Sequence, residues 1–231
     1  MRIINKLREL KFLLTRTSYS QAGEDSVVRF LFSDIGLKNI SYLDLGTNNP
    51  KYGNNTYWFY KNNSRGVCVE ADPSLISKIK KYRSKDKVIH AGVSIDNSSN
   101  SKFYIFNQAA LNTFDLIEAN KRSLSGKYKV IKEVNVPLLT INDLIAQNFD
   151  TYPDFLSIDI EGLDYDVLKS LNYLIYPIPV MCVETCTYSE NHIRQKDTKL
   201  INFMLEKDYF IYADTYLNTI FVNKSWFNKT N

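Results

Sequence analysis

Acidic residues stand at the ends of several short apolar stretches of this sequence. Asp44 and Glu70 end two early stretches, and Asp159 and Glu184 end two later ones. Apolar runs this short, bounded by polar residues, are typical of buried parallel strands. The carboxyl ends of parallel strands meet at one edge of a sheet, where open α/β sheets bind their ligands. We therefore expect a carboxylate-lined ligand site at that edge.

The loop after Asp44 has a single glycine, Gly46, in "DLGTNNP". Dinucleotide-binding loops use several glycines so that the backbone can touch a pyrophosphate, and here position 48 is Asn. A carboxylate facing a pyrophosphate would be repulsive, whereas one facing a cation is favourable. The loop thus favours a ligand with a ribose and an ammonium group but no phosphate, such as S-adenosylmethionine. An NAD-dependent sugar-modifying oxidoreductase is the alternative, and the missing glycines argue against it.

The second and third predicted strands add to this site. Glu70 follows Asp44 by 26 residues and ends "GVCVE", where a carboxylate can accept hydrogen bonds from both ribose hydroxyls. A strand-terminal acid can equally be a helix cap. Gly92 and Val93, in "HAGVS", could line an adenine or simply pack at a strand end.

The candidate catalytic residues lie at the fourth and fifth predicted strands. Asp159, Glu161 and Glu184 could together bind Mg²⁺ or Mn²⁺ through oxygen ligands, which would lower the pKa of a bound hydroxyl. Alternatively, one carboxylate acts as a general base without metal, its pKa raised by its neighbour. His192, in the loop after the fifth strand, is a further candidate base. Glu161 could also be an ordinary acid at a helix N-terminus.

These residues must be positioned by alternating strands and helices. We predict parallel strands, helices between them, a doubly wound mostly parallel sheet, and a closing antiparallel hairpin over 209–214 and 217–223. Residues 101–137 read as an inserted β pair, with a polar loop at 108–131 that could act as a lid. The strands are expected at 40–46, 66–72, 87–93, 154–162 and 179–185, and the helices near 24–35, 54–62, 73–83, 140–148, 164–171 and 195–207.

Bulk properties limit the classes of function. The 231 residues fit one domain, and 29 basic against 25 acidic residues give a modest net charge of +4, with no run of like charges that would demand nucleic acid. Three cysteines without a Cys-x-x-Cys pair favour reduced thiols in a cytoplasmic protein. Residues 1–19 predict a basic helix, packed on the domain or at a homodimer contact, and charges interrupt it too often for a membrane span.

Six stretches of the chain resemble the FkbM family of S-adenosylmethionine-dependent methyltransferases. The Ser-Gln-x-Gly-Glu-Asp and Ile-Asp-x-Glu-Gly motifs are the most specific of them. They run in family order as "SQAGEDSVV" (20–28), "YLDLGTNNP" (42–50), "NNTYWFY" (54–60), "GVCVEADP" (66–73), "VPLLTINDLI" (136–145) and "FLSIDIEGLDYDVL" (155–168).

The resemblance implies one class I methyltransferase domain over 1–231, with a seven-stranded, mostly parallel sheet whose last strand is antiparallel. It implies an O-methyltransferase acting on a small polar acceptor, such as a sugar or nucleotide-activated sugar of polysaccharide or natural-product biosynthesis. A non-catalytic binding module with the same fold is a further alternative. Carried over onto this sequence, the residues that hold the cofactor would be Gln21, Asp44, Gly46, Asn55, Thr56 and Glu70. We expect Ala71, Gly92, Val93 and Asp159 to complete the cofactor site.

Overall fold

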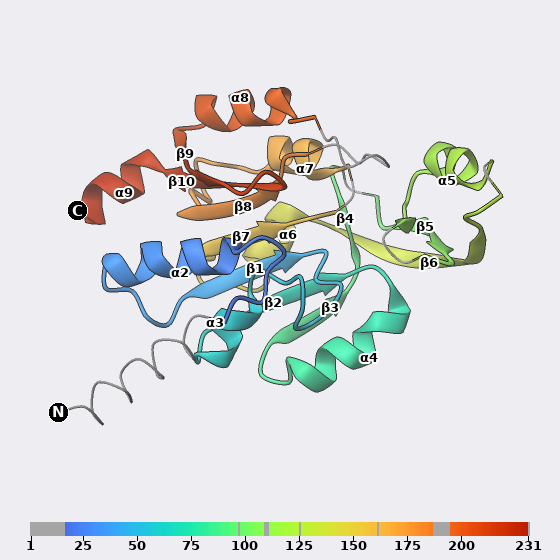
Figure 1. Cartoon of the computed structure of the whole chain (residues 1–231), viewed down its shortest axis with the longest axis horizontal. Coiled ribbons are helices and arrows are strands. Elements are labelled where there is room, and N and C mark those ends of the chain that lie inside the picture. Colours follow the sequence, from blue (N-terminus) through green and yellow to red (C-terminus); the bar gives the residue numbers. More distant parts are fainter. Residues whose placement is uncertain are drawn as a thin grey trace, which may run out of the picture.

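A seven-stranded sheet organises the chain, seen in a computed structural model that describes residues 17–96, 98–108, 111–124, 126–160, 162–186 and 195–230. The strand order is β3-β2-β1-β7-β8-β10-β9 (Figure 1). All neighbours pair in parallel except β10, which is antiparallel to both β8 and β9. The strands are β1 (Ser41–Leu45), β2 (Arg65–Glu70), β3 (Lys87–His90), β7 (Phe155–Ile158), β8 (Val180–Glu184), β9 (Tyr209–Asp214) and β10 (Asn218–Asn223). The predicted doubly wound sheet and the closing hairpin are confirmed.

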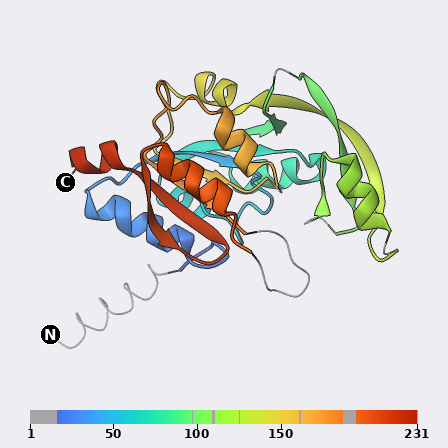
Figure 2. The same ribbon diagram turned by 90° about the horizontal axis from the view of Figure 1, so that it is seen from above.

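A second, three-stranded sheet of order β4-β6-β5 departs from the predicted pattern in one respect. We expected one strand over 87–93, but the chain breaks at Ala91, and β4 (Gly92–Ser94) leaves the main sheet to pair with β6 (Val130–Thr140). β5 (Asn100–Phe106) pairs antiparallel with β6, which confirms the inserted β pair. This small sheet extends away from the main one (Figures 1 and 2).

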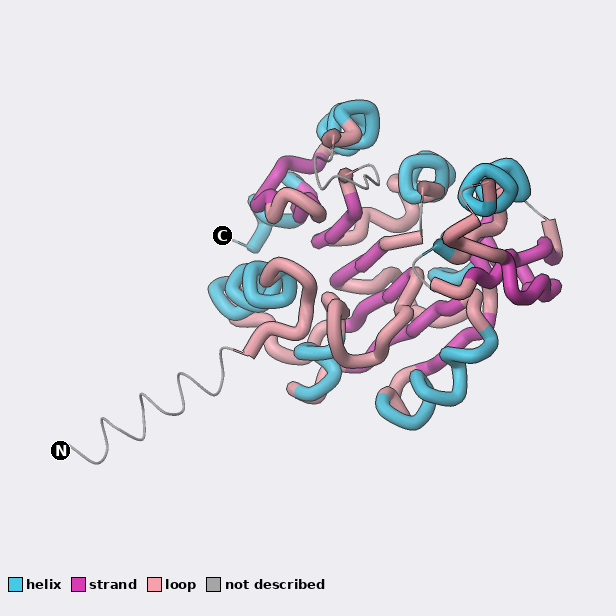
Figure 3. The backbone as a smooth tube through the Cα atoms, turned by 45° about the vertical axis from the view of Figure 1, so that its right-hand side comes forward, coloured by secondary structure: helices cyan, strands magenta, loops and turns pink. Residues whose placement is uncertain are grey.

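Helices alternate with the strands, as Figure 3 shows in cyan and magenta. Asp72 caps α4 by accepting from the Ser74 N–H, with Pro73 in the first turn, and Thr140 caps α6 by accepting from the Asp143 N–H. The helices are α2 (Glu24–Asp34), α3 (Tyr57–Lys61), α4 (Pro73–Tyr82), α5 (Leu116–Ser123), α6 (Ile141–Ala146), α7 (Asp164–Ser170), α8 (Thr198–Glu206) and α9 (Lys224–Thr230).

Two of these helices were not predicted. The segment 108–131 was expected to be a polar loop, but α5 lies within it, capped by Asp115, whose side chain accepts from the N–H groups of Ile117 and Glu118. The prediction was wrong because the helix is short, and its buried side consists mainly of Ala119. α9 follows the last strand directly.

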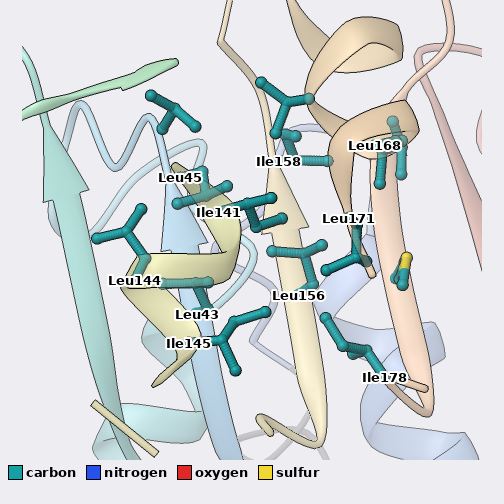
Figure 4. Packing of buried hydrophobic residues seen from close by; sticks show 14 of the residues in the cluster. Leu43, Leu45, Ile141, Leu144, Ile145, Leu156, Ile158, Leu168, Leu171 and Ile178 are labelled. Atoms are coloured by element: carbon teal, nitrogen blue, oxygen red, sulfur yellow. The ribbon is translucent and has the colours of Figure 1, made fainter. Parts of the chain in front are cut away.

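Alternation along the central strands produces two hydrophobic layers. Leu43 and Leu45 face the layer that contains α6, α7 and α8, whereas Tyr42 faces the layer that contains α2 and α3. Figure 4 shows the first layer at close range, with Leu144 of α6 and Leu168 of α7 on the same side of the sheet as the β1 leucines. The result is a three-layer α/β/α arrangement, in which the loops at the carboxyl ends of the strands are carried on a rigid core.

The predicted helix over 1–19 lies almost wholly outside the described residues, because the description begins at Thr17. Among the described residues, no helix combines the length and the apolar composition needed to cross a bilayer.

Candidate active site

A cavity of about 620 Å³ opens at the carboxyl ends of β1, β2 and β7 and is closed on another side by the inserted segment. Its volume lies within the ~300–1,000 Å³ typical of small-ligand pockets. Nearly all the predicted cofactor residues line it. These are Gln21, Asp44, Gly46, Asn55, Glu70, Ala71, Gly92, Val93 and Asp159. The predicted edge of the sheet therefore carries a cavity that is the candidate site.

Asp44 is held at the base of the loop that follows β1, where it is only 3% exposed. Its Oδ2 accepts hydrogen bonds from Asn54 Nδ2 at 3.0 Å and from Thr56 Oγ1 at 2.9 Å. Burial raises the pKa of the Asp44 carboxyl, while the charge of Arg83 and the two hydrogen bonds oppose that rise. The loop thus fixes the carboxylate in one orientation.

Arg83 is a positioning residue that the sequence did not reveal. Its side chain is fully buried, with Nε 2.7 Å from Asp86 Oδ2. The guanidinium also donates to Thr56 Oγ1 at 2.9 Å, Asn54 Oδ1 at 3.1 Å and the Pro50 carbonyl at 3.4 Å. It therefore ties the loop to the end of α4. In the sequence it stands among surface lysines, so no pattern distinguishes it from a solvated arginine.

Glu70 ends β2 and is oriented by two backbone groups. Oε2 accepts from the Asn48 N–H at 2.8 Å, and Oε1 accepts from the Asp72 N–H at 2.7 Å. Burial raises the pKa of Glu70, and these two hydrogen bonds oppose the rise. Because a carboxylate oxygen can accept more than one hydrogen bond, both oxygens keep acceptor capacity toward the cavity.

Gly46 allows β1 and β7 to approach each other at the cavity. It has φ +79°, and a Cβ there would overlap the carbonyl oxygen of Asp159. The Asp159 N–H donates to the Leu45 carbonyl at 3.1 Å, which fixes this approach. The single glycine of the loop is thus required by the neighbouring backbone, in addition to its place in the cavity wall.

Asn55 and Thr56 have different positions, although both were predicted to hold the cofactor. Asn55 lines the cavity, where its Nδ2 donates to Ser157 Oγ at 3.1 Å. Thr56 is fully buried behind the wall, bonded to Asp44 and Arg83, and does not line the cavity. Its placement supports the loop rather than the ligand.

Gln21 lines the cavity, and the two acids that end its Ser-Gln-x-Gly-Glu-Asp motif are both anchored. The Glu24 carboxylate accepts from Thr215 Oγ1 at 2.7 Å and Asn218 Nδ2 at 2.8 Å, and so joins α2 to the closing hairpin. Asp25 accepts from the Tyr19 N–H at 2.7 Å. The acids of this motif therefore hold the start of α2, next to Gln21, in place.

On the side predicted for adenine, an aromatic pair from the inserted segment closes the wall. Phe114 packs against Phe103 with ring centroids 4.6 Å apart, and a Cβ on Gly92 would overlap the Phe114 ring. Asn112 joins this segment to the sheet edge by donating from Nδ2 to Asp72 Oδ2 at 3.2 Å. These residues could not be predicted because no sequence pattern indicates that the insertion packs against this edge of the main sheet.

Asp159 follows β7 on the cavity wall, and a second carboxylate lies behind it. Asp164, at the start of α7, is 5% exposed, and its two oxygens accept from the N–H groups of Ile160 and Gly162, each at 3.3 Å. Burial, together with the charge of Asp159, raises the pKa of Asp164 to about 7. Asp164 thus holds the backbone that follows Asp159.

The remaining candidate catalytic and metal residues are not brought together among the described residues. Glu184 ends β8 opposite Asn218 of β10 and does not line the cavity, so the expected convergence with Asp159 is not seen there. Glu161 and His192 lie outside the described residues. Within the described part of the chain, no three His, Cys, Asp or Glu side chains form a group that could hold a metal ion.

Asp44, in β1, and Glu70, at the end of β2, line the cavity, and both lie within the part of the chain that matches a known family. Residues 44–211 match the Methyltransferase FkbM domain, which is well over half of the chain. The chain belongs to the FkbM methyltransferase family. It is an S-adenosylmethionine-dependent methyltransferase, which confirms the resemblance noted in its sequence.

Solved structures of other methyltransferases resemble this FkbM-family chain over nearly its whole length. A TehB-like S-adenosylmethionine-dependent methyltransferase from Corynebacterium glutamicum has 9% identity and TM-score 0.47, covering 95% of this chain and 97% of that one. An O-methyltransferase from Bacillus cereus in complex with SAH has 11% identity and TM-score 0.39, covering 96% and 90%. The Burkholderia thailandensis 1,6-didemethyltoxoflavin-N1-methyltransferase has 10% identity and TM-score 0.43, covering 96% and 84%. No curated protein matches the sequence.

Proposed function

We propose that this chain transfers a methyl group to a hydroxyl oxygen of a small polar acceptor, with a sugar as the best fit. The observation that carries the proposal is the position of Asp159, a carboxylate that lines the same cavity as Asp44 and Glu70. The neighbouring polar groups, Asn55 and Ser157, can hydrogen-bond to hydroxyls.

The donor set fits S-adenosylmethionine. In the proposed arrangement, Glu70 would accept from the ribose hydroxyls through its free acceptor capacity, and Gly92, Val93 and Phe114 would surround the adenine. Asp44 and Gln21 would be near the amino acid portion. When bound, the cofactor supplies a methyl carbon already activated by a positively charged sulfur.

The role of Asp159 in this proposal is to orient and deprotonate the acceptor hydroxyl. Alignment of the reacting groups can account for much of the rate, since effective molarities reach about 10⁵ M or more. A general base adds roughly 10²–10⁴. A metal-assisted reaction with Asp159, Glu161 and Glu184 stays a separate prediction, tested by turnover in chelator and then with added Mg²⁺ or Mn²⁺.

The charge of the cavity favours an acceptor without phosphate groups. Among the described lining residues there are six carboxylates and one guanidinium, that of Arg122. An excess of acidic groups suits a cationic cofactor and repels a diphosphate. We therefore prefer a neutral sugar over the nucleotide-activated sugar that the sequence left open.

The cysteines, the cavity wall and the family bear on the other predictions about this protein. The three cysteines, Cys68, Cys182 and Cys186, are buried and form no disulfide, which supports our proposal of a cytoplasmic location. A non-catalytic module would not need Asp159 on the cavity wall. An NAD-dependent oxidoreductase is disfavoured by the family, and a homodimer remains a prediction.

The test is methyl transfer from isotopically labelled S-adenosylmethionine to a panel of neutral sugars, amino sugars and nucleotide sugars. We expect the label on an oxygen of a neutral sugar, and a drop in kcat of about 10²–10⁴ for Asp159→Asn. The matched control is Asp166→Asn, a change in the first turn of α7 that does not touch the cavity wall. Label on nitrogen or carbon, or full activity of Asp159→Asn, would overturn the proposal.

A further inference from the structure

α5 turns an apolar face toward solvent. Leu116, Ile117 and Leu124 are 53%, 76% and 86% exposed. Helical spacing puts these three residues on one side of the helix, while Glu118 and Arg122 on the other side line the cavity. A surface helix ordinarily has the reverse arrangement, with its apolar stripe facing the core. The exposed apolar face is therefore a candidate binding surface.

Basic residues surround this face. Lys121 follows Ile117 by one helical turn, and its side chain is 72% exposed. The exposed Lys127 and Lys129 lie in the link to β6. The second and third residues of β6 are Ile131, which is 65% exposed, and the exposed Lys132. In Figures 1 and 2, α5 and this link form an outer end of the molecule. We call this surface the α5 tip, and it consists of Leu116, Ile117, Lys121, Leu124, Lys127, Lys129, Ile131 and Lys132.

We propose that the α5 tip docks on an anionic lipid bilayer. Exposed aliphatic side chains next to lysines are the signature of helices that lie in a membrane interface, where each basic residue adds about 1 kcal/mol of attraction. Of the acids near the tip, Glu118 lies between Lys121, at 3.4 Å, and Arg122, at 3.6 Å, so it offsets part of one lysine's charge. The other two are engaged with groups other than the lysines of the tip. Asp115 caps α5, and Glu133 lies 3.3 Å from the ammonium of Lys102.

A lipid surface explains this composition better than another protein does. The strongest anchors of protein interfaces are Trp, Tyr and Arg, whereas the exposed anchors of the tip are leucine and isoleucine. A second copy of the chain, related by a two-fold axis, would bring the lysines of both copies together. An anionic bilayer satisfies both the aliphatic and the basic side chains.

Docking would bring the active site to the membrane. Because α5 lines the cavity with one side and carries the apolar face on the other, the bilayer would lie one helix away from the cavity wall. An acceptor attached to a lipid would then be concentrated beside the site. Binding to lipid does not depend on the proposed methyl transfer, so each can fail without the other.

The experiment is co-sedimentation of the full chain with vesicles of phosphatidylcholine alone or mixed with phosphatidylglycerol. We expect binding to the mixed vesicles, weakened by salt. Ile117→Glu with Leu124→Glu should weaken it at least about tenfold, because two apolar contacts are replaced by charges. Replacing Lys121, Lys127 and Lys129 by Gln should weaken it about fivefold for each lysine.

A matched control is Leu174→Glu with Ile175→Glu, which changes two residues that are 97% and 59% exposed outside the tip. This control should bind vesicles like the unchanged chain. The affinity of the Ile117/Leu124 variant for S-adenosylmethionine should also be unchanged, which shows that it is folded. Equal binding to both vesicle types, or undiminished binding by the Ile117/Leu124 variant, would overturn the proposal. A concentration-dependent dimer that this variant abolishes would overturn it too, because the surface would then bind a second copy.

Discussion

The two walls of the cavity are built in different ways. The sheet-edge wall, made by the loop 44–56 with Glu70, is supported by fully buried charged groups, including the Arg83–Asp86 pair. The insertion wall, made by β5, α5 and the chain between them, rests on small clusters of four and three buried residues. Its Lys102–Glu133 ion pair is largely exposed, with side chains 64% and 52% accessible.

This difference separates what is fixed from what can vary. Buried charges leave little tolerance for change, because removing one partner leaves the other uncompensated in the interior. Exposed ion pairs contribute only about 0–1 kcal/mol and can be exchanged. We infer that the sheet-edge wall holds most of the cofactor, whereas the insertion wall, apart from Phe114 beside the proposed adenine position, is the part that can vary with the acceptor and the surface.

The largest expected effect comes from removing the buried arginine of the sheet-edge wall. Arg83→Met should lower the free energy of unfolding by about 3–5 kcal/mol, because Asp86 would be left as an unpaired buried charge. The matched change in the insertion wall, Arg122→Met, should cost about 1–2 kcal/mol, since Arg122 loses one hydrogen bond to the Leu111 carbonyl and a 3.6 Å ion pair with the partly exposed Glu118. Urea denaturation of both variants measures this difference. Equal losses would contradict the contrast between the walls.

The next effect compares two glycines with positive φ. Gly46→Ala should cost more than about 3 kcal/mol, because the added Cβ meets the carbonyl of Asp159 as well as an unfavourable φ of +79°. Gly126→Ala, in the link after α5, has φ +69° and no atom within 4 Å of the Cβ, so it should cost only about 1 kcal/mol. Thermal unfolding compares them, and a similar cost for both would show that the β1–β7 approach can relax.

A smaller effect concerns the pH dependence of stability. The pKa of Asp164 is about 7 in the folded protein, which is above its value in an unfolded chain. Folding therefore favours the protonated acid, and this contribution to stability is lost as the pH rises from about 4 to about 7. The difference in free energy of unfolding between Asp164→Asn and wild type should therefore shift in favour of Asp164→Asn by on the order of 2 kcal/mol from pH 5 to pH 8. If the unfolding free energies of wild type and Asp164→Asn change by the same amount between the two pH values, the raised pKa of Asp164 does not contribute to stability.

The smallest effect is on the pH dependence of cofactor binding. Burial raises the pKa values of Asp44 and Glu70 in the free protein, and a cationic ligand favours their ionised forms. The affinity for S-adenosylmethionine should therefore rise with pH as these two carboxyl groups ionise. The rise is at most about tenfold per pH unit for one proton released. Calorimetry in buffers of different ionisation enthalpy measures the protons released, and proton uptake would reverse the assigned sign.

The sheet and its edge could be predicted because they follow from local patterns. The apolar runs of β1, β2, β7 and β8 are bounded by polar residues, and each carries its acid at a position that the strand direction fixes. The predicted strand over 154–162 was too long, because β7 ends at Ile158. The error arose because the apolar pattern of the strand continues into the loop.

The insertion wall could not be predicted because its contacts join segments that have no common pattern. The break at Ala91 depends on β4 pairing with β6, which begins 36 residues after β4 ends. Likewise, the packing of Phe114 over Gly92 depends on how the insertion folds back. Arg83 was missed for the same reason, since its partners on the loop lie 27 to 33 residues earlier.

The most direct test of the account is the binding of S-adenosylmethionine to the wild type and to Glu70→Ala, measured by calorimetry. The N–H groups of Asn48 and Asp72 already hold Glu70 in place before the cofactor binds. Removing the Glu70 side chain should therefore weaken binding by the loss of its proposed hydrogen bonds to the ribose. We predict measurable binding by the wild type and a loss of about 1.5–3 kcal/mol in Glu70→Ala. The Glu133→Ala variant, changed in the exposed ion pair, should bind like the wild type. No binding by the wild type at millimolar cofactor, or unchanged affinity in Glu70→Ala, would contradict the account.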